Sequence, residues 1–317
     1  LSGIQTVKGS DVFWMTLNDI AFSGYGDTIY LNSYEYPKYE CAVETIQKRF
    51  VQQVKSQYPM HNFGRTAPIL NALRVVKSDD EVAITQRACD ITAKAFRRCL
   101  STVKPGMYEY EVQAEIEYIF KQNNATGHAY APIIAGGKNG CCLHYSKNQS
   151  LLNDGDLLLF DIGCELKNYS SDLSRTIPIN GTFTERQKDC YNAVLRVMKE
   201  ITRLYRPGGT INEINETTHR LMEQEMIKLG LFTAEDVKNQ NPDKPLERKY
   251  LMHGMSHHIG LDVHDSIDKF KPFAPGMILT CEPGIYIREE GIGIRIENDL
   301  LITEGEPINL FEGLPNL

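Results

Sequence analysis

Apolar residues recur at helical spacing in four long segments, and each segment is expected to form an amphipathic helix. Two of these helices begin at a capping box, at Ser78 and at Thr184, because Glu or Gln stands three residues after each cap residue. They end before the Pro-Gly pairs at residues 105–106 and 207–208. The other two helices are predicted over residues 109–122 and 211–229.

Short apolar runs follow each pair of helices and are expected to be strands. They cover residues 131–134, 141–144, 157–160, 277–282 and 293–299. The order helix, helix, strands therefore occurs twice, and residues 104–107 resemble residues 206–209 in carrying a basic residue followed by Pro-Gly. We infer a mixed α/β (α+β) chain with an internal duplication, in which two α/β halves enclose a central cleft.

The run at residues 157–160 shows no polar alternation, so its strand is expected to be buried on both faces. The strand continues to Asp161, and Lys167-Asn168 supplies a two-residue turn. A turn there pairs residue 166 with 169 and residue 163 with 172, which places Asp161 and Asp172 diagonally on one face, about 7–8 Å apart. Two buried carboxylates this close need a shared proton or a cation, and we favour the cation.

Residues 1–75 differ from the rest, and we interpret them as a small, incomplete α/β domain that precedes a catalytic domain at residues 76–317. Residues 11–16 and 30–31 alternate like short strands, and a helix is expected over residues 39–55. The first residue is Leu, so the chain is interpreted as processed or trimmed. Whether a targeting segment has been removed stays an open question.

Composition narrows the possible partners. A hydrophobic content of 42% and a charged content of 24% are typical of a globular protein, and no apolar stretch is long enough to span a bilayer. The net charge of −7, without a basic cluster, argues against a nucleic-acid partner. The eight cysteines show no CxxC spacing, so we expect buried free thiols in a reducing compartment, the cytoplasm, and no structural zinc site.

Half of the chain's eight histidines lie within twelve positions, at His253, His257, His258 and His264. The spacing of His253 and His257 invites the zinc-protease motif in which two His lie four apart on a helix. That motif needs Glu directly after the first His, and here the residue is Gly254, so this interpretation fails.

Three acids, Asp161, Glu282 and Glu297, close or follow apolar strand runs, and Asp172 is expected opposite Asp161. Charged groups are seldom buried without a metal or a partner. Four carboxylates with one histidine suit Mn²⁺, with Co²⁺ or Zn²⁺ as alternatives. They exceed what one ion needs, which favours two ions about 3.5–4 Å apart that share a hydroxide as nucleophile.

These motifs resemble the pita-bread metallopeptidase family, and most closely its Xaa-Pro aminopeptidase branch, over residues 76–310. The matching segments are Asp161-Ile-Gly, Asp172-Leu-Ser-Arg-Thr, residues 253–265, Glu282-Pro-Gly-Ile-Tyr and Ile294-Arg-Ile-Glu297. The resemblance implies a duplicated α/β half-barrel around two divalent ions, usually manganese. It implies Asp161 on one ion, His257 and Glu282 on the other, and Asp172 and Glu297 bridging both.

The resemblance also implies that His144, His253 and His264 line the substrate site, with Arg295 facing it and Tyr286 nearby. His258 is then structural or pocket-lining. The implied reaction is attack of the bridging hydroxide on the carbonyl carbon of the bond before proline. His264 and His144 would donate hydrogen bonds to the substrate carbonyl, and Glu282 would pass the water's proton to the leaving nitrogen.

The alternatives are a prolidase, which cleaves Xaa-Pro dipeptides, and a non-catalytic binding protein of the same fold. Residues 266–270 differ from the form associated with prolidases, and no predicted ligand is missing, so both are less favoured. Methionine aminopeptidases lack a domain like residues 1–75. The expected substrates are peptides with Pro in the second position, and the resemblance implies a homo-oligomer, a dimer or a tetramer.

Overall fold

The computed structural model describes residues 3–24, 26–33, 43–265 and 271–314. The chain divides into an N-terminal unit, Leu1–Leu73, and a C-terminal unit, Arg74–Leu317.

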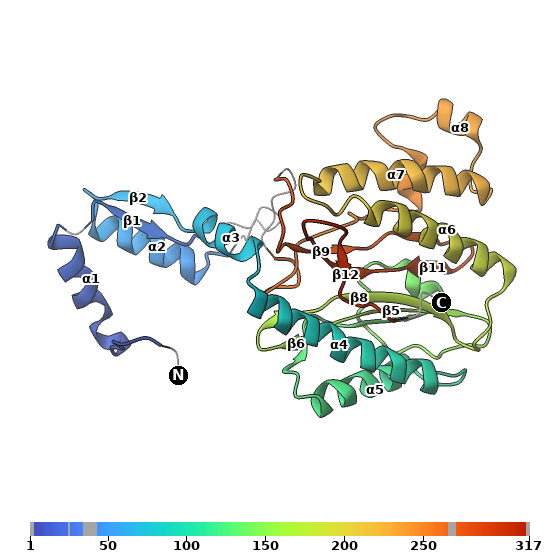
Figure 1. The fold of residues 1–317 in the computed structure, drawn as a ribbon, viewed down its shortest axis with the longest axis horizontal. Helices are drawn as coiled ribbons and strands as arrows, with labels where there is room; N and C mark the ends of the chain where they lie inside the picture. The colour runs from blue at the N-terminus through green and yellow to red at the C-terminus, as the bar shows by residue number, and fades with distance from the viewer. Residues whose placement is uncertain (1–2, 25, 34–42, 266–270, 315–317) are drawn as a thin grey trace. The chain divides into compact units, whose positions relative to one another are not determined.

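In its described residues, the N-terminal unit contains a two-stranded parallel sheet, two helices and most of a third helix, which continues past Leu73 (Figure 1). Strands β1 (Thr28–Leu31) and β2 (Asn62–Arg65) pair from Thr28↔Asn62 to Leu31↔Arg65. The helices are α1 (Phe13–Phe22), which follows a short 3-10 turn η1 (Ser10–Val12), α2 (Ile46–Gln57) and α3 (Ala67–Val75). Leu31, Val54 and Tyr58 form a small buried cluster, so this unit has a modest core.

The strand predicted at residues 11–16 is wrong, because most of this segment belongs to α1. Trp14 also fits helical spacing with Leu17 and Ala21, and these three residues pack against the small core. The predicted helix begins at Ile46, later than expected, because the Thr45 side chain caps it by accepting from the Lys48 amide. Residues 39–42 of that prediction lie outside the described residues.

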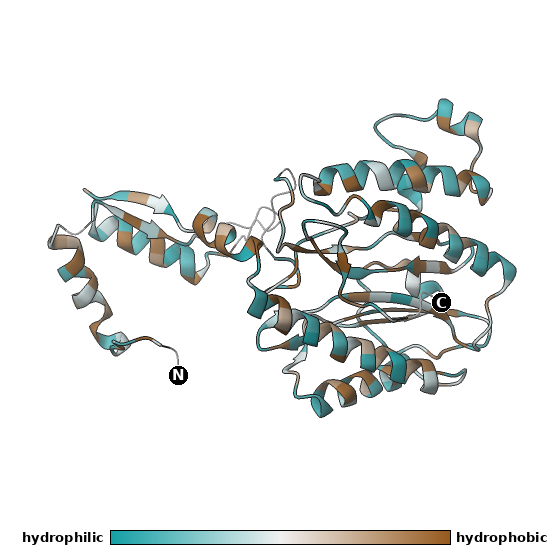
Figure 2. Cartoon of the chain, in the orientation of Figure 1, coloured by the Kyte–Doolittle hydropathy of each residue, from teal (hydrophilic) through white to brown (hydrophobic). Residues whose placement is uncertain are grey.

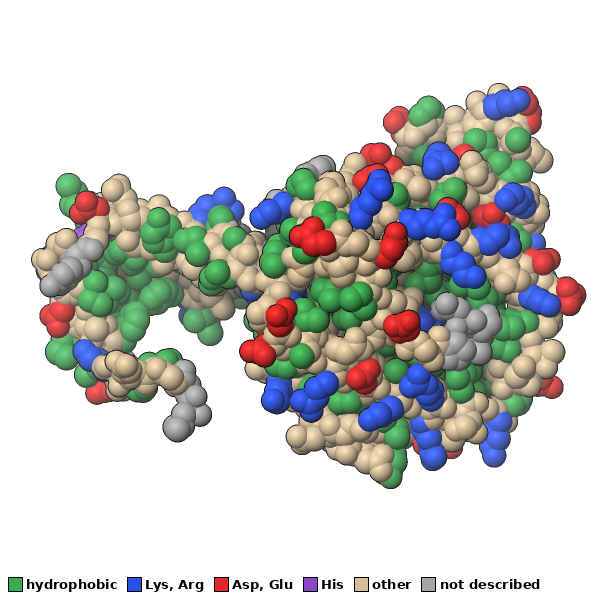
Figure 3. Space-filling view, viewed as in Figure 1, with side chains coloured by type: hydrophobic (Ala, Val, Ile, Leu, Met, Phe, Trp, Pro, Cys, Tyr) green, Lys and Arg blue, Asp and Glu red, His purple; other side chains and the backbone are tan. Residues whose placement is uncertain are grey.

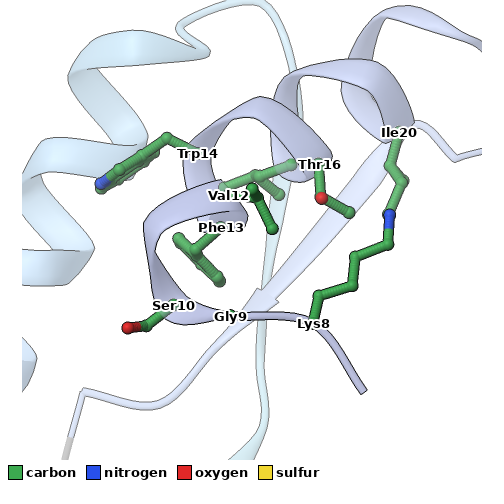
Figure 4. Close-up of a pocket in the computed structure, with 9 residues that line it drawn as sticks. Lys8, Gly9, Ser10, Val12, Phe13, Trp14, Thr16 and Ile20 are labelled. Carbon is green, nitrogen blue, oxygen red and sulfur yellow. The ribbon is translucent and has the colours of Figure 1, made fainter. Parts of the chain in front are cut away.

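A pocket of about 510 Å³ lies along α1 (Figure 4). It is lined by Lys8, Gly9, Ser10, Val12, Phe13, Trp14, Thr16, Leu17 and Ile20. None of these residues is acidic, a histidine or a cysteine, so the pocket lining carries no metal-ligating side chain of these types, and Lys8 is its one charged residue. The candidate chemistry lies in the C-terminal unit.

The C-terminal unit places helices on both sides of its strands. In Figure 1, α4 (Asp79–Thr102) and α5 (Glu109–Gln122) lie on one side, and α6 (Glu185–Thr202) and α7 (Ile211–Lys228) on the other. The capping boxes predicted at Ser78 and Thr184 are both present, which confirms the two helix starts. The short helix α8 (Ala234–Lys238) and the 3-10 turn η3 (Leu246–Lys249) were not predicted.

The described strands of the C-terminal unit form four small sheets. The first orders β4 (Ile133–Gly136), β5 (Leu157–Ile162) and β8 (Leu173–Pro178), and the second orders β3 (Gly127–His128), β6 (Cys164–Leu166) and β7 (Tyr169–Ser170). The third orders β13 (Ile308–Asn309), β12 (Asn298–Leu301) and β9 (Ile278–Cys281), and the fourth pairs β10 (Gly284–Ile287) with β11 (Ile292–Arg295).

Strand β5 is buried on both faces, as predicted. Leu157 and Leu159 belong to one hydrophobic cluster with residues of α6 and α7, whereas Leu158 and Phe160 belong to another with residues of α4 and α5. Figure 2 shows the apolar strands between helices whose outer surfaces are more polar. Side chains alternate along a strand, so Asp161 lies on the same face of β5 as Leu157 and Leu159, the face that packs with α6 and α7.

The hairpin register is confirmed. Leu166 pairs with Tyr169, and the same register continues to Asp161↔Ser174. Lys167 and Asn168 have φ values of 50° and 69°, so both turn residues adopt the left-handed conformation of a two-residue hairpin turn. Asp172 is therefore diagonal to Asp161.

Two strand predictions need correction. Residues 141–144 are not a strand, because the 3-10 turn η2 (Gly137–Cys141) is followed by a turn in which the Cys142 amide bonds the Asn139 carbonyl. Residues 293–299 form two strands, since Arg295 pairs with Gly284 of β10 whereas Asn298 pairs with Cys281 of β9. The chain changes partner strands between them.

The described cysteines are free, and Cys142 alone among them is exposed, as expected for buried thiols; Cys41 lies outside the described residues. In the part of the chain that the structure describes, no helix has the length and apolar character needed to cross a bilayer. On the face shown in Figure 3, basic and acidic side chains of the C-terminal unit are interspersed.

Gly163, between Asp161 and Asp172 in sequence, gives a test of how tightly the hairpin is packed. A Cβ at this position would collide with the Ser171 carbonyl oxygen and lie 2.9 Å from a ring carbon of Tyr130. We expect Gly163→Ala to lower the free energy of unfolding by about 3 kcal/mol or more, measured by urea denaturation. The control is Gly127→Ala in β3, where a Cβ meets nothing within 4 Å, and equal stability of both variants would contradict this packing.

Candidate metal centre

Four acids identified in the sequence come from the ends of different strands. Asp161 lies in β5, and Asp172 directly precedes β8. Glu282 directly follows β9, and Glu297 lies in the break between β11 and β12. Asp172 and Glu297 are buried, with 5% and 2% of their surface exposed, whereas Asp161 and Glu282 are half-buried. The strand ends thus bring acidic side chains inside the unit.

Asp172, His257 and Glu297 form a compact group of candidate metal ligands. Each offers one ligand atom, and these atoms all lie within 4.8 Å of one another. His257 Nε2 lies 3.5 Å from Asp172 Oδ2 and 3.8 Å from Glu282 Oε1. Three of the five predicted ligands therefore surround one point, and Glu282 lies beside the histidine of this group.

The fifth predicted ligand, Asp161, is linked to this group through Tyr130. The Tyr130 hydroxyl lies 2.6 Å from Oδ1 of Asp161 and 2.6 Å from Oδ1 of Asp172. One hydroxyl has a single proton to donate, so both short contacts are satisfied together when one carboxyl carries a proton. The two diagonal carboxylates therefore share one hydroxyl group as a hydrogen-bond partner.

The orientation of His257 suits a metal ligand. Its Nδ1 lies 3.1 Å from the His258 carbonyl oxygen, which can only accept, so Nδ1 carries the proton and Nε2 faces the acids. The His257 amide donates to Thr280 Oγ1, and the Thr280 hydroxyl donates to Glu282 Oε1. Strand β9 thereby holds the histidine and the glutamate in fixed relation.

The acids carry more negative charge than their neighbours neutralise. Burial raises the pKa of Asp172 and of Glu297 well above the usual carboxyl range, and repulsion from Asp161 and Asp172, respectively, raises each further. Burial also raises the pKa of Glu282. Oxygen donors with one imidazole and a surplus of buried negative charge fit a divalent cation. The residues present therefore suit the divalent metal predicted from the sequence.

Arg295 is buried in this group. Its guanidinium donates to Asp161 Oδ2 at 2.6 Å, to the Tyr286 hydroxyl at 2.8 Å and to Ser174 Oγ at 2.8 Å. The Ser174 hydroxyl in turn donates to Glu297 Oε2 at 2.7 Å. Arg295, expected to face the substrate, lies 4% exposed against the acids and fixes their positions.

His253 and Tyr286 form a neighbouring pair. His253 Nδ1 lies 2.8 Å from the Gly254 carbonyl, and Nε2 lies 2.8 Å from the Tyr286 hydroxyl. Burial, followed by the charge of Arg295, lowers the pKa of His253 to about 3. His253 is therefore neutral, donating through Nδ1 and accepting from Tyr286 through Nε2. Its Nδ1 lies 3.7 Å from Glu282 Oε2, which places the pair beside the candidate ligands.

The remaining predicted histidines are placed differently. The His264 ring centroid lies 4.3 Å from that of His257, with the rings nearly perpendicular, and His264 is exposed. His144 is also exposed, and no hydrogen bond or ion pair within the described residues ties it to the acids. His258 is buried, consistent with a structural role. The structure thus places His264 beside the candidate ligand His257, whereas His144 lies on an exposed loop.

Three residues of the site, Tyr130, Ser174 and Asp299, were not predicted from the sequence. Ser174 shares a face with Asp172 by the two-residue strand period, so that period could have identified it. Tyr130 lies in an unremarkable segment with no motif around it. Asp299 is buried and accepts from the Asp172 amide at 3.0 Å, and it continues the strand period from Glu297.

Tyr130 gives a direct test of the contacts around Asp161 and Asp172. Removing a hydrogen-bond partner of metal-ligating carboxylates typically costs 10- to 100-fold in metal affinity. We therefore expect Tyr130→Phe to weaken Mn²⁺ binding about 10-fold or more, measured by calorimetric titration. Tyr118→Phe, on an exposed tyrosine of α5, serves as the control. Equal affinity of the two variants would remove Tyr130 from the centre.

Comparison with known proteins gives concordant matches. The model of metallopeptidase family M24 matches residues 83–304. The Xaa-Pro aminopeptidase of Escherichia coli is 38% identical over 320 aligned positions, covering 96% of this chain and 68% of that protein. The human Xaa-Pro aminopeptidase 3 is 36% identical, covering 78% of this chain and 50% of that protein.

Solved structures agree. A variant of Escherichia coli aminopeptidase P in complex with substrate has a TM-score of 0.80 and 35% identity, covering 94% of this chain and 71% of that one. A candidate aminopeptidase P from Bacillus anthracis has a TM-score of 0.91 and 36% identity, covering 99% of this chain and 73% of that one. The chain spans 68% of the length of the Escherichia coli Xaa-Pro aminopeptidase and 50% of the length of the human Xaa-Pro aminopeptidase 3.

Proposed function

The chain belongs to metallopeptidase family M24, and from this premise we propose that it removes the N-terminal residue from peptides that carry proline in the second position. The reaction is metal-dependent hydrolysis of the Xaa–Pro bond. The observation that carries the proposal is the convergence of Asp172, His257 and Glu297 within 4.8 Å, with Asp161 and Glu282 beside them. The Xaa-Pro aminopeptidase of Escherichia coli matches nearly the whole chain.

We assign the metal ligands to Asp161, Asp172, His257, Glu282 and Glu297. Four carboxylates and one imidazole suit two divalent ions, with Mn²⁺ preferred and Co²⁺ or Zn²⁺ as alternatives. Such ions, when bound, lower the pKa of a water molecule and polarise the scissile carbonyl. Arg295 supports the ligand set by holding Asp161 directly and Glu297 through Ser174.

Glu282 is the proposed proton carrier. Burial raises its pKa, so its carboxyl accepts a proton more readily than a solvent-exposed glutamate does. It is half-buried, which leaves it within reach of a substrate. In this role it takes a proton from the nucleophilic water and delivers it to the proline nitrogen that leaves.

His264 and His144 are the proposed hydrogen-bond donors to the substrate. His264 is exposed beside His257, so its ring can bind a carbonyl oxygen next to the ligand set. His144, on an exposed loop, is the second donor. His253 is the proposed contact for the substrate, because its half-buried, neutral ring offers an uncharged surface for the proline ring, and the fully buried Tyr286 acts in substrate binding by holding that ring through its hydroxyl.

The experiment compares three peptides on protein stripped of metal and then loaded with Mn²⁺. Hydrolysis is followed by measuring release of the N-terminal residue. We expect the Xaa-Pro-Yaa tripeptide to be hydrolysed, and neither the Xaa-Pro dipeptide nor the Xaa-Ala-Yaa tripeptide. Cleavage of the dipeptide alone would assign the chain to the prolidases. Metal binding without cleavage of any peptide would assign it to binding proteins of this fold.

We also propose that the protein acts in the cytoplasm as a homo-oligomer, a dimer or a tetramer. The buried free thiols support a reducing compartment. Light scattering coupled to size-exclusion chromatography gives the mass of the assembly directly, and a monomer mass of 36.0 kDa for this chain would contradict the oligomer.

A further inference from the structure

Arg74, Lys77 and Asp265 form a buried charged group, here called the Asp265 cluster. Lys77 Nζ lies 3.4 Å from Asp265 Oδ2, and Arg74 Nη2 lies 2.6 Å from Asp265 Oδ1. The side chains of Lys77 and Asp265 are each 1% exposed. Arg74 also pairs with Asp262 at 2.5 Å. Burying ions is costly even when they are paired, so a cluster of this kind calls for a reason beyond stability.

The Asp265 cluster is connected to His257 through one carbonyl group. The Asp265 amide donates to the His258 carbonyl oxygen at 2.8 Å. The same oxygen accepts from His257 Nδ1 at 3.1 Å. This carbonyl fixes the proton of His257 on Nδ1 and leaves Nε2 for the metal. The Asp265 amide therefore holds the carbonyl that leaves Nε2 of His257 available to a metal.

The cluster also sets the position of His264. Asp265 follows His264 directly in sequence, so a fixed Asp265 limits where the His264 ring can lie. That ring is 4.3 Å from the ring of His257. One anchored aspartate thus holds a candidate ligand through a hydrogen bond and a candidate substrate-binding residue through the backbone.

The surroundings of the cluster leave little freedom of movement. The Lys77 amide donates to the Gly276 carbonyl at 2.8 Å, and the Ser170 amide donates to the Gly260 carbonyl at 2.8 Å. A Cβ on Gly260 would collide with the Asp265 carboxylate and lie 2.8 Å from Lys77 Cε. Displacement of any of these groups is therefore transmitted to the others.

We propose that Lys77 and Arg74 are positioning residues that act through Asp265 on His257 and His264. They hold Asp265 so that the His258 carbonyl orients His257 for metal binding and the His264 ring lies against it. The catalytic part of this inference rests on the proposed function, whereas the metal-binding part does not.

The melting temperature of Lys77→Met distinguishes a positioning role of Lys77 from a purely structural one. Burial lowers the pKa of Lys77, although Asp265 opposes this shift, so the charged form of Lys77 is kept at a cost. Met fills a similar volume without that cost, and Asp265 keeps Arg74 as its partner. The melting temperature of the metal-free variant is therefore expected to change little, while the function of the histidines suffers.

The first measurement is the affinity of metal-free protein for Mn²⁺ alone, by calorimetric titration. We expect Lys77→Met to weaken binding about 10-fold or more, as for other residues that orient metal ligands. Arg186→Met, which breaks the Arg186–Glu290 pair elsewhere in the unit, is the matched control and should bind Mn²⁺ as the parent does. Equal affinity of the parent and Lys77→Met would overturn the link to His257.

The second measurement is kcat at saturating Mn²⁺ with an Xaa-Pro-Yaa tripeptide. We expect Lys77→Met to lower kcat about 10-fold in the parent and to have no further effect in a His264→Ala background. Additive losses would overturn the link to His264. If Lys77→Met does not fold, Arg74→Met tests the same contact, and the same outcomes apply. If the parent binds Mn²⁺ but cleaves no peptide, the proposed function fails while the affinity measurement still decides this inference.

Discussion

Replacing Asp172 by Asn is expected to abolish turnover while leaving the fold intact. Asp172 lies 5% exposed between His257 and the Tyr130 hydroxyl, and it is assigned to bind both ions. An amide of the same shape removes the charge that a cation needs. We expect kcat/KM to fall by at least about 10³-fold, which corresponds to roughly 4 kcal/mol of transition-state stabilisation.

The same substitution should stabilise the metal-free protein. Burial and the charge of Asp161 raise the pKa of Asp172, so its ionised form is unfavourable in the folded state. Asn removes that charge and still offers an oxygen to Tyr130. The expected result is a higher melting temperature without metal and a smaller rise when Mn²⁺ is added, measured by differential scanning fluorimetry.

Asp154→Asn is the control, because Asp154 is exposed and bonds Asn180 at a turn. It should change neither the rate nor the response to Mn²⁺. Unchanged turnover in Asp172→Asn would remove Asp172 from the mechanism. A lower melting temperature of the metal-free variant would show that the carboxylate stabilises the fold, contrary to the charge argument.

The candidate centre could be predicted from sequence where local rules carry the information. The two-residue turn at Lys167-Asn168 sets the register, and the register sets the distance between Asp161 and Asp172. Capping boxes at Ser78 and Thr184 placed two helices correctly for a similar reason. These features depend on residues close together in the chain.

Other features depend on contacts that a single sequence does not reveal. Tyr130 reaches Asp161 and Asp172 because β4 lies beside β5, and nothing in its own segment indicates this. The break at Glu297 arises because the chain changes its pairing partner there. Strand β11 pairs with β10, whereas β12 pairs with β9, and both partners lie earlier in the sequence. The helix at Trp14 shows the remaining difficulty, since a short aromatic segment fits either periodicity.

Removing the metal is expected to reverse the pH dependence of stability. The carboxyls concerned have pKa values raised in the folded protein by burial, namely Asp172, Glu282, Glu297 and Asp299. A folded state with raised carboxyl pKa values binds more protons than the unfolded state, so unfolding releases protons. The free energy of unfolding is then greatest below the unfolded pKa, near 4, and falls as the pH rises through the folded values.

Asp299 shows the size of the effect. Burial raises its pKa from 3.8 to about 7, although the Asp172 amide and the Cys89 thiol donate to it. At about 1.4 kcal/mol for each pKa unit, this residue alone accounts for a loss on the order of 4 kcal/mol between pH 4 and pH 7. Asp299→Asn should therefore flatten the pH dependence of the metal-free protein.

The metal-loaded protein should behave in the opposite way. Divalent ions compete with protons for the carboxylates, so their affinity rises with pH and their binding adds stability that grows in the same direction. Melting temperatures measured from pH 5 to pH 8 should fall without metal and rise with saturating Mn²⁺, and the two curves should diverge. Parallel curves would mean that these acids do not bind the metal, because Asp172, Glu282 and Glu297 take part both in proton release on unfolding and in proton release on metal binding.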